Sequence, residues 1–172
     1  AMPSWQVAMN ELSNHDHSRF LTRTSRKVGR TNTLGPEAAN HGNNEAVFRE
    51  AVVMQMTWMG APTIYYGDEA GLCGFTDPDN RRTYPWGKED TNLLDYYKAL
   101  GEIRRNNKAF CSGEFIPVYA NFGEIVYIRK SGNEQVLIAA TRWHEGSTVT
   151  IPDEFINAEC LLGEKPNGNQ IT

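Results

Sequence analysis

The chain has 172 residues, which is enough for one domain with its own core, or for one domain and part of a second. Hydrophobic residues make up 40% and aromatic residues 10%, which excludes a chain that is disordered throughout. No run of about 18 apolar residues occurs, so the sequence predicts no membrane span. The formal net charge of -4 argues against a nucleic-acid-binding surface, which is usually basic. We therefore expect neither nucleic acid nor a membrane as a partner.

The first elements alternate between apolar runs and long polar segments. Residues 3–13 are rich in apolar side chains, and their pattern fits a helix or a strand. Residues 14–44 are polar and predict a long loop, which in a compact domain is usually functional. This segment holds a basic run without any acidic residue, which is typical of a solvated surface. The members of the run are Arg19, Arg23, Arg26, Lys27 and Arg30.

An α/β pattern follows. Residues 45–59 predict a largely buried helix that Asn43 or Asn44 can cap, and that ends at Gly60. Residues 63–66, Thr-Ile-Tyr-Tyr, predict a short buried strand. A helix followed by a buried strand is the repeating piece of a parallel sheet or barrel.

A second long loop is predicted over residues 67–91, and a helix over residues 92–105 with Thr91 or Asn92 as its cap. Beyond Phe110 the pattern changes to short strand candidates about ten residues apart, which are typical of a small antiparallel sandwich. These candidates are residues 115–119, 123–129, 136–141, 147–151 and 160–162. We expect one domain over residues 1–110 and a second, truncated one over residues 111–172.

The cysteines, Cys73, Cys111 and Cys160, are widely spaced and odd in number. This pattern matches neither a disulfide framework nor a zinc site. It predicts three buried free thiols, which are typical of a reducing compartment, and therefore favours a cytoplasmic location.

Functional side chains are densest at Asn14-His15-Asp16-His17, where an apolar stretch gives way to a loop. A carboxylate beside an imidazole can bind vicinal hydroxyl groups, and its charge can stabilise positive charge that develops on a sugar ring. The alternative is a loop whose His and Asp side chains make only local caps.

A second group of polar residues is Asp77-Pro78-Asp79-Asn80-Arg81-Arg82. Its carboxylates and guanidinium groups could line a sugar cleft through directional hydrogen bonds. Aromatic residues nearby could supply stacking faces, although Tyr65 and Tyr66 also suit a core. These aromatic residues are Tyr65, Tyr66, Phe75, Tyr84 and Trp86.

Metal binding is the competing interpretation of both groups. His15 and His17 have a spacing found in metal-dependent hydrolases, but zinc needs three or four ligands, and His41 and His144 lack suitable acidic neighbours apart from Glu145. Residues 77–80 resemble a calcium loop only in part, since the Gly and the closing Glu are missing. We expect no cofactor, with calcium as the alternative.

The order of these motifs resembles the α-amylase family of glycoside hydrolases, and the neopullulanase or maltogenic-amylase type in particular. The likeness rests on Asn14-His15-Asp16, on the block Gly60-Ala61-Pro62-Thr63-Ile64-Tyr65-Tyr66-Gly67-Asp68-Glu69, on Gly74, on Asp77 to Arg81, and on Pro85-Trp86. It implies the C-terminal part of a (β/α)8 barrel, comprising the end of strand seven, helix seven, strand eight and helix eight, followed by a β-sandwich. The long insert 19–44 and His17 depart from the shortest family pattern.

The resemblance also implies roles for single residues. Asp16 matches the aspartate that stabilises the transition state, and His15 and Asn14 belong to the same sugar-contacting motif. Asp77 and Arg81 match a loop that contacts neighbouring sugars. The implied reaction is cleavage of α-1,4 or α-1,6 glucosidic bonds with retention of configuration, in substrates such as starch, pullulan and maltooligosaccharides.

A retaining glycosidase also needs a nucleophile and a general acid about 5–5.5 Å apart. In the family these come from strands four and five, and no such segment precedes residue 10. We therefore expect the isolated chain to be inactive, and to associate with the missing part of the barrel or with itself. The alternative function is a non-catalytic carbohydrate-binding or assembly module.

Overall fold

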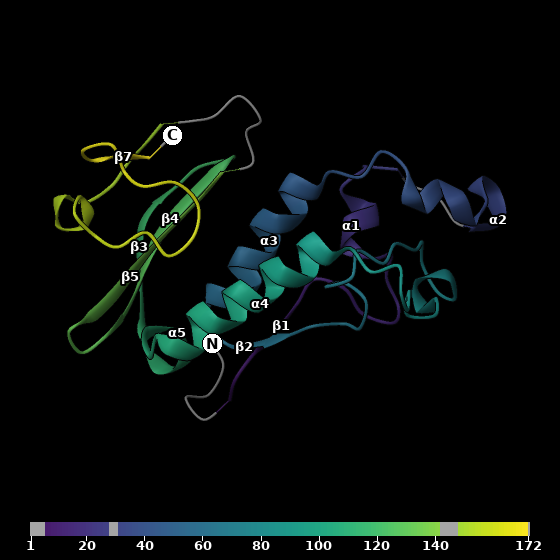
Figure 1. Ribbon diagram of the computed structural model, residues 1–172, viewed down its shortest axis with the longest axis horizontal. Helices are drawn as coiled ribbons and strands as arrows, with labels where there is room; N and C mark the ends of the chain where they lie inside the picture. The colour runs from purple at the N-terminus through teal and green to yellow at the C-terminus, as the bar shows by residue number, and fades with distance from the viewer. Residues whose placement is uncertain (1–5, 28–30, 142–147, 172) are drawn as a thin grey trace. The chain divides into compact units, whose positions relative to one another are not determined.

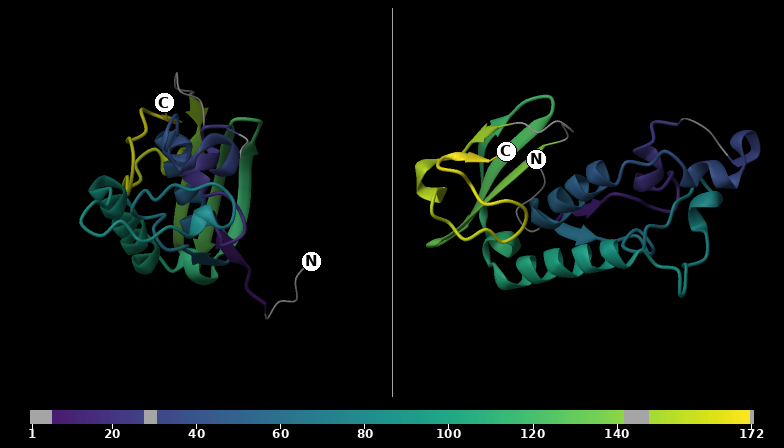
Figure 2. Two further views of the ribbon diagram at one scale, coloured as in Figure 1. Left: turned by 90° about the vertical axis from the view of Figure 1, so that its right-hand side faces the viewer. Right: turned by 45° about the horizontal axis from the view of Figure 1, so that its top comes forward.

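The computed structural model describes residues 6–27, 31–141 and 148–171 (Figure 1 and Figure 2). It divides into two compact units, Ala1–Arg104 and Arg105–Thr172. The first unit combines helices with a pair of parallel strands, and the second consists mainly of antiparallel strands. Within the described ranges, no helix is both long and apolar enough to cross a membrane.

Two short parallel strands organise the first unit. β1 (Met9–Glu11) pairs with β2 (Ala61–Thr63), with Glu11 opposite Thr63. The strand predicted over residues 63–66 is therefore displaced toward the N-terminus, and the prediction of a buried strand there was wrong. After Thr63 the chain turns, with the amide of Asp68 bonded to the carbonyl of Tyr65, and Tyr66 is left exposed.

The helix α3 (Glu45–Thr57) connects the two strands (Figure 1). Its predicted cap is confirmed, because the side chain of Asn44 accepts a hydrogen bond from the amide of Val47 at 3.1 Å. The helix ends two residues earlier than predicted, because Trp58 already has an extended backbone. Gln55 is buried in the last turn, and its amide donates to the carbonyls of Asn10 and Thr63, which ties the helix to both strands.

Residues 14–44 are not the continuous loop that was predicted. They contain α1 (Phe20–Arg23), α2 (Thr31–Leu34) and the 3-10 helix η1 (Pro36–Asn40). These turns are held by tertiary contacts, which a sequence pattern does not reveal: Leu21 and Ala39 pack into the core, and Thr22 donates to the carbonyl of Ala39.

The second long helix, α4 (Thr91–Asn106), supplies the other wall of this core. Leu93, Tyr97 and Leu100 are buried in one cluster with Phe48 and Val52 of α3. The predicted cap was wrong by one or two residues, because the Asp90 carboxylate accepts from the amides of Asn92 and Leu93. Between β2 and α4 lies the predicted loop, in which one 3-10 turn, η2 (Asp79–Arg81), forms.

The second unit contains a three-stranded antiparallel sheet in the order β3-β4-β5. A smaller antiparallel pair, β6 with β7, lies in the same unit, and Ile128, Ile151 and Phe155 form a shared apolar cluster. The strand predicted over residues 160–162 does not form. The elements are α5 (Ala109–Ser112), β3 (Glu114–Ala120), β4 (Glu124–Ser131), β5 (Glu134–Thr141), β6 (Val149–Thr150), η3 (Asp153–Phe155) and β7 (Gln170–Ile171).

The three cysteines are free, but the prediction that all are buried was wrong. Cys73 is buried in the core of the first unit, Cys111 is exposed, and Cys160 is partly exposed. Burial raises the pKa of the Cys73 thiol.

Candidate functional site

The candidate site lies at one edge of the β1–β2 pair. Because the strands are parallel, the segments that leave their carboxyl ends emerge at the same edge. Residues 12–19 follow β1, and residues 64–82 follow β2. The fold therefore places both predicted groups of polar residues where active sites of parallel α/β proteins usually lie.

Asn14 shapes the first segment. Its side-chain oxygen accepts from the amides of Asp16 and His17 at 3.0 and 3.1 Å and lies 3.0 Å from Nδ1 of His17. Its amide nitrogen donates to Glu11 at 2.8 Å. This tight turn leaves His15 and Asp16 in solvent, with side chains 67% and 64% exposed and 3.4 Å between His15 Nε2 and Asp16 Oδ1. Asn14 thus supports the turn, and His15 and Asp16 are the side chains available to a ligand.

The second segment is bonded directly to the first. Asn80 is fully buried, and its amide donates to the carbonyls of Asn14 at 3.0 Å and His17 at 2.8 Å. Arg81 Nε donates to the carbonyl of His15 at 3.2 Å, while Arg81 Nη2 lies 2.9 Å from an oxygen of Asp77. The five predicted site residues are therefore brought together. Asn80 was part of the motif, but sequence reasoning gave it no role.

Arg19 was also missed, because it lies in the basic run that was expected to be solvated. It is fully buried, and Nη1 lies 2.9 Å from Asp68 Oδ1. Its guanidinium also donates to the carbonyls of Tyr66 and Asn80, and it lies 4.2 and 4.7 Å from the ring centroids of Tyr65 and Tyr66. Tyr65 and Tyr66 therefore cover a buried cation, a contact that stabilises the charge.

Asp68 is the anionic partner of Arg19. Burial raises the pKa of Asp68, and hydrogen bonds from Ser13 and Arg19 oppose that rise. The motif Gly67-Asp68-Glu69 was noted in the sequence, but nothing local connects Asp68 to Arg19, which lies 49 positions earlier. The pair joins the segment after β1 to the segment after β2, beneath the exposed residues.

The 19–44 insert is attached through Arg82 to the segment that follows β2. This side chain makes two hydrogen bonds to the Asp79 carboxylate, at 3.0 and 2.8 Å, and reaches Asn40 and the carbonyl of Pro36 in η1. The 19–44 insert therefore borders the candidate site.

Chemically, the exposed groups of the site suit a neutral, polyhydroxylated ligand. The carboxylates of Asp16 and Asp77 can accept hydrogen bonds from hydroxyl groups, and Arg81 and His15 can donate them. In the described part of the chain, no group of three or more His, Cys, Asp or Glu side chains is placed to hold a metal ion. His144 and Glu145, which were weighed as metal ligands, lie outside the described residues.

Comparisons with known proteins agree with the family resemblance that the motifs indicate. No family model matches the chain. The amylopullulanase of Thermoanaerobacterium saccharolyticum is 39% identical over 191 aligned positions, which cover 99% of this chain and 15% of that protein. Neopullulanase 2 of Thermoactinomyces vulgaris is 34% identical, over 96% of this chain and 27% of that protein. The chain thus spans well under a third of these relatives.

Solved structures give the same result. An α-amylase of Anoxybacillus has a TM-score of 0.72 at 27% identity, over 95% of this chain and 35% of that one. A cyclomaltodextrinase has a TM-score of 0.71 at 29% identity, over 85% of this chain and 23% of that one. The resemblance of this chain to the α-amylase family of glycoside hydrolases is thereby confirmed over most of its length.

Proposed function

We propose that the chain supplies one side of the sugar-binding cleft of a retaining hydrolase that acts on α-glucans. The observation that carries the proposal is the bonded arrangement of His15-Asp16 and Asp77-Arg81 at one edge of two parallel strands. Exposed carboxylate and guanidinium groups of this kind bind hydroxyl groups rather than apolar ligands. By their names, the amylopullulanase and the neopullulanase reported above act on pullulan, and the cyclomaltodextrinase acts on cyclic maltodextrins.

In this proposal β1, α3, β2 and α4 are strand seven, helix seven, strand eight and helix eight of a (β/α)8 barrel, and the second unit is the sandwich that follows it. A barrel of this type carries its active site at the carboxyl ends of its strands. The edge from which the 12–19 and 64–82 segments emerge is such an edge.

Each site residue then has the role that the family resemblance implies, and its chemistry suits that role. Asp16 stabilises the positive charge of the oxocarbenium-like transition state through its own negative charge. His15 donates a hydrogen bond to a sugar hydroxyl in the same subsite, and Asn14 holds the turn that presents both. Asp77 and Arg81 bind a neighbouring sugar, and bonding to the His15 carbonyl keeps Arg81 next to the reacting subsite.

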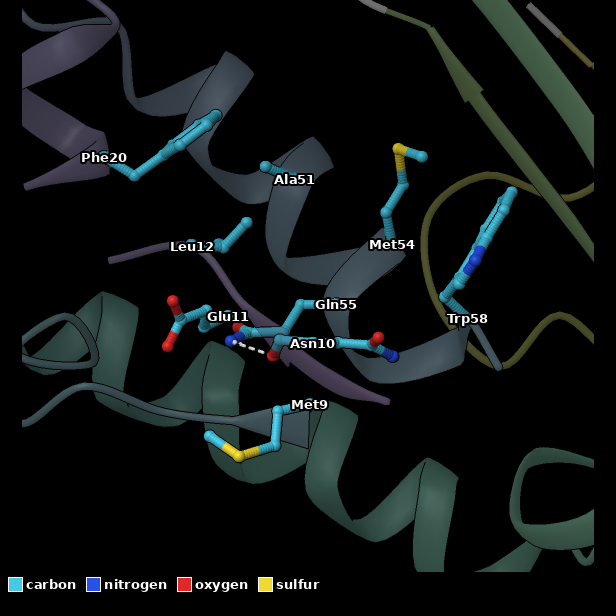
Figure 3. A pocket seen from close by; sticks show the side chains of 9 residues that line it. All are labelled: Met9, Asn10, Glu11, Leu12, Phe20, Ala51, Met54, Gln55 and Trp58. Carbon is cyan, nitrogen blue, oxygen red and sulfur yellow. Dashed lines mark hydrogen bonds between the residues drawn. The ribbon is translucent and has the colours of Figure 1, made fainter. Parts of the chain in front are cut away.

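The nucleophile and the general acid would come from another part of the same barrel. Among the described residues, β1 pairs with β2 alone, so its other edge is unpaired. Beside β1 and α3 lies a largely apolar groove of about 530 Å3, lined by residues that include Met9, Leu12, Phe20 and Trp58 (Figure 3). We infer that the remaining strands and helices of the barrel pack there, and that the chain alone catalyses no hydrolysis.

The test uses the longer protein that contains this chain, assayed for release of reducing sugar from pullulan, starch and cyclodextrin. Asp16→Asn removes the charge with little change in size, and kcat is expected to fall at least about 100-fold. Asp95→Asn is the matched control, because Asp95 is an exposed residue of α4 whose carboxylate pairs with Lys98. Unchanged kcat in Asp16→Asn would refute the proposed role of Asp16. Measurable turnover by the isolated chain would refute the inference that it is inactive.

A further inference from the structure

An exposed tryptophan stands on the loop between η2 and α4. Trp86 is 78% exposed, although burial of an indole is strongly favourable. It occupies the second position of a turn in which the amide of Lys88 bonds to the carbonyl of Pro85 at 2.8 Å. Gly87 follows with φ of 73°, the conformation that a type II turn requires at its third position. The turn therefore holds Trp86 at its tip.

Tyr84 supports the indole from one side. The two ring centroids are 4.5 Å apart with an interplanar angle of 48°, and the amide of Trp86 bonds to the carbonyl of Tyr84. The Tyr84 ring thus packs against the indole, and the backbone bond between the two residues holds them together.

Both ends of the loop are fixed to the first unit. Upstream, the carbonyl of Arg82 accepts from the Tyr66 hydroxyl at 2.9 Å. Downstream, the amide of Asp90 bonds to the carbonyl of Ala70 at 3.1 Å, and Asp90 caps α4. A ligand that stacks on these rings would not have to order the loop first, which lowers the entropic cost of binding.

We propose that the exposed Trp86 indole, packed against Tyr84, forms a stacking platform for a glucose unit of an α-glucan chain. A pyranose ring has an apolar C–H face that can cover an indole while its hydroxyl groups remain hydrated at the edge. The platform follows Asp77 and Arg81 on the segment between β2 and α4, and we assign it to a sugar unit other than the one that those two residues bind. The inference rests on the proposed function and adds a binding determinant to it.

The surroundings of Trp86 fit an oligosaccharide better than a protein partner. Stable protein interfaces bury about 800 Å2 on each side and have an apolar centre that is poor in charged residues. Within residues 81–90, the exposed residues other than Trp86 are polar, charged or glycine, namely Arg81, Thr83, Gly87 and Lys88. A single exposed aromatic ring with hydrogen-bonding groups around it suits the binding of a sugar.

The experiment measures binding of maltotriose and maltoheptaose to the chain by calorimetry. We expect Trp86→Ala to weaken maltoheptaose binding about tenfold, the size of one aromatic contact, and Trp86→Phe to restore most of the loss. Maltotriose should be affected less, because it can bind at Asp77 and Arg81 without reaching the platform. Phe122→Ala, which removes a residue 82% exposed in the second unit, is the matched control and should change neither affinity.

Arg81→Ala separates this inference from the proposed function. If Arg81→Ala weakens binding and Trp86→Ala does not, the platform is refuted while the site stands. If only Trp86→Ala weakens binding, the platform is supported and the proposed site loses its basis. Absence of any maltoheptaose binding refutes the platform, and the proposed function then depends on Asp16→Asn in the longer protein. Unchanged sugar affinity together with altered self-association in Trp86→Ala refutes the platform in favour of a protein contact.

Discussion

Arg19 is the residue on which the arrangement of the site depends most. It is fully buried, pairs with Asp68, and bonds the carbonyls of Tyr66 and Asn80. Asn80 in turn bonds the carbonyls of Asn14 and His17, so a chain of contacts runs from the guanidinium to the turn that presents Asp16. A buried ion pair contributes little net stability, but removal of one partner leaves an unpaired charge in the interior.

We therefore expect Arg19→Met to lower the free energy of unfolding by about 3 kcal/mol or more, measured by urea denaturation. Lys98→Met is the control, because it breaks the exposed Lys98–Asp95 pair and should cost less than about 1 kcal/mol. If Arg19→Met does not fold, the double variant Arg19→Met with Asp68→Asn, which leaves no buried charge at the pair, should recover part of the stability. Equal losses in Arg19→Met and Lys98→Met would show that the buried pair has no special structural role.

At the level of elements, the loops of the site are held by close approach of backbone to backbone. Gly74 lies between the two segments: its carbonyl accepts from the amide of Arg19, and its amide bonds to Thr22 Oγ1 at 3.0 Å. A Cβ at this position would lie 2.6 Å from the carbonyl oxygen of Asp79 and 2.9 Å from Cα of Asn80. These are backbone atoms, so they cannot move aside without shifting the loop that carries Arg81.

Gly74→Ala should therefore destabilise the first unit by about 1–3 kcal/mol, as overpacking usually does. Gly101→Ala is the matched control, because Gly101 lies within α4 and a Cβ there meets nothing within 4 Å. That substitution should stabilise the chain by up to about 1 kcal/mol, since alanine favours a helix over glycine. Urea denaturation of both variants checks the prediction, and equal effects in the two would mean that residues 74 and 79–80 are not tightly packed.

For the whole molecule, the sequence predicted what is local and missed what depends on distant contacts. Helix α3 and its Asn44 cap were predicted because apolar spacing and capping residues are adjacent in the chain. The residues of the site were predicted from their motifs, but the Arg19–Asp68 pair was not, because its members are 49 positions apart. The short turns α1, α2 and η1 were missed for a different reason: each has four or five residues, too few to show a period.

The exposed edge of β1 bears on whether the chain self-associates in solution. Met9, the first residue of β1, is 65% exposed, and Val7, two residues before the strand, is 69% exposed. Among the described residues, β1 pairs with β2 alone. Unpaired strand edges with exposed apolar residues are templates for pairing with another chain. When the rest of a barrel does not cover this edge, we expect the chain to self-associate as its concentration rises.

Met9→Lys should shift the chain toward the monomer, because a lysine at a strand edge opposes pairing with a second strand. Sedimentation velocity over a series of concentrations measures the effect. Leu34→Lys is the control, since Leu34 is 47% exposed on α2, away from β1, and should leave the distribution unchanged. If the unmodified chain is a monomer at every concentration, the prediction is wrong. The edge of β1 and the groove beside it would then be stable in water without the rest of a barrel to cover them.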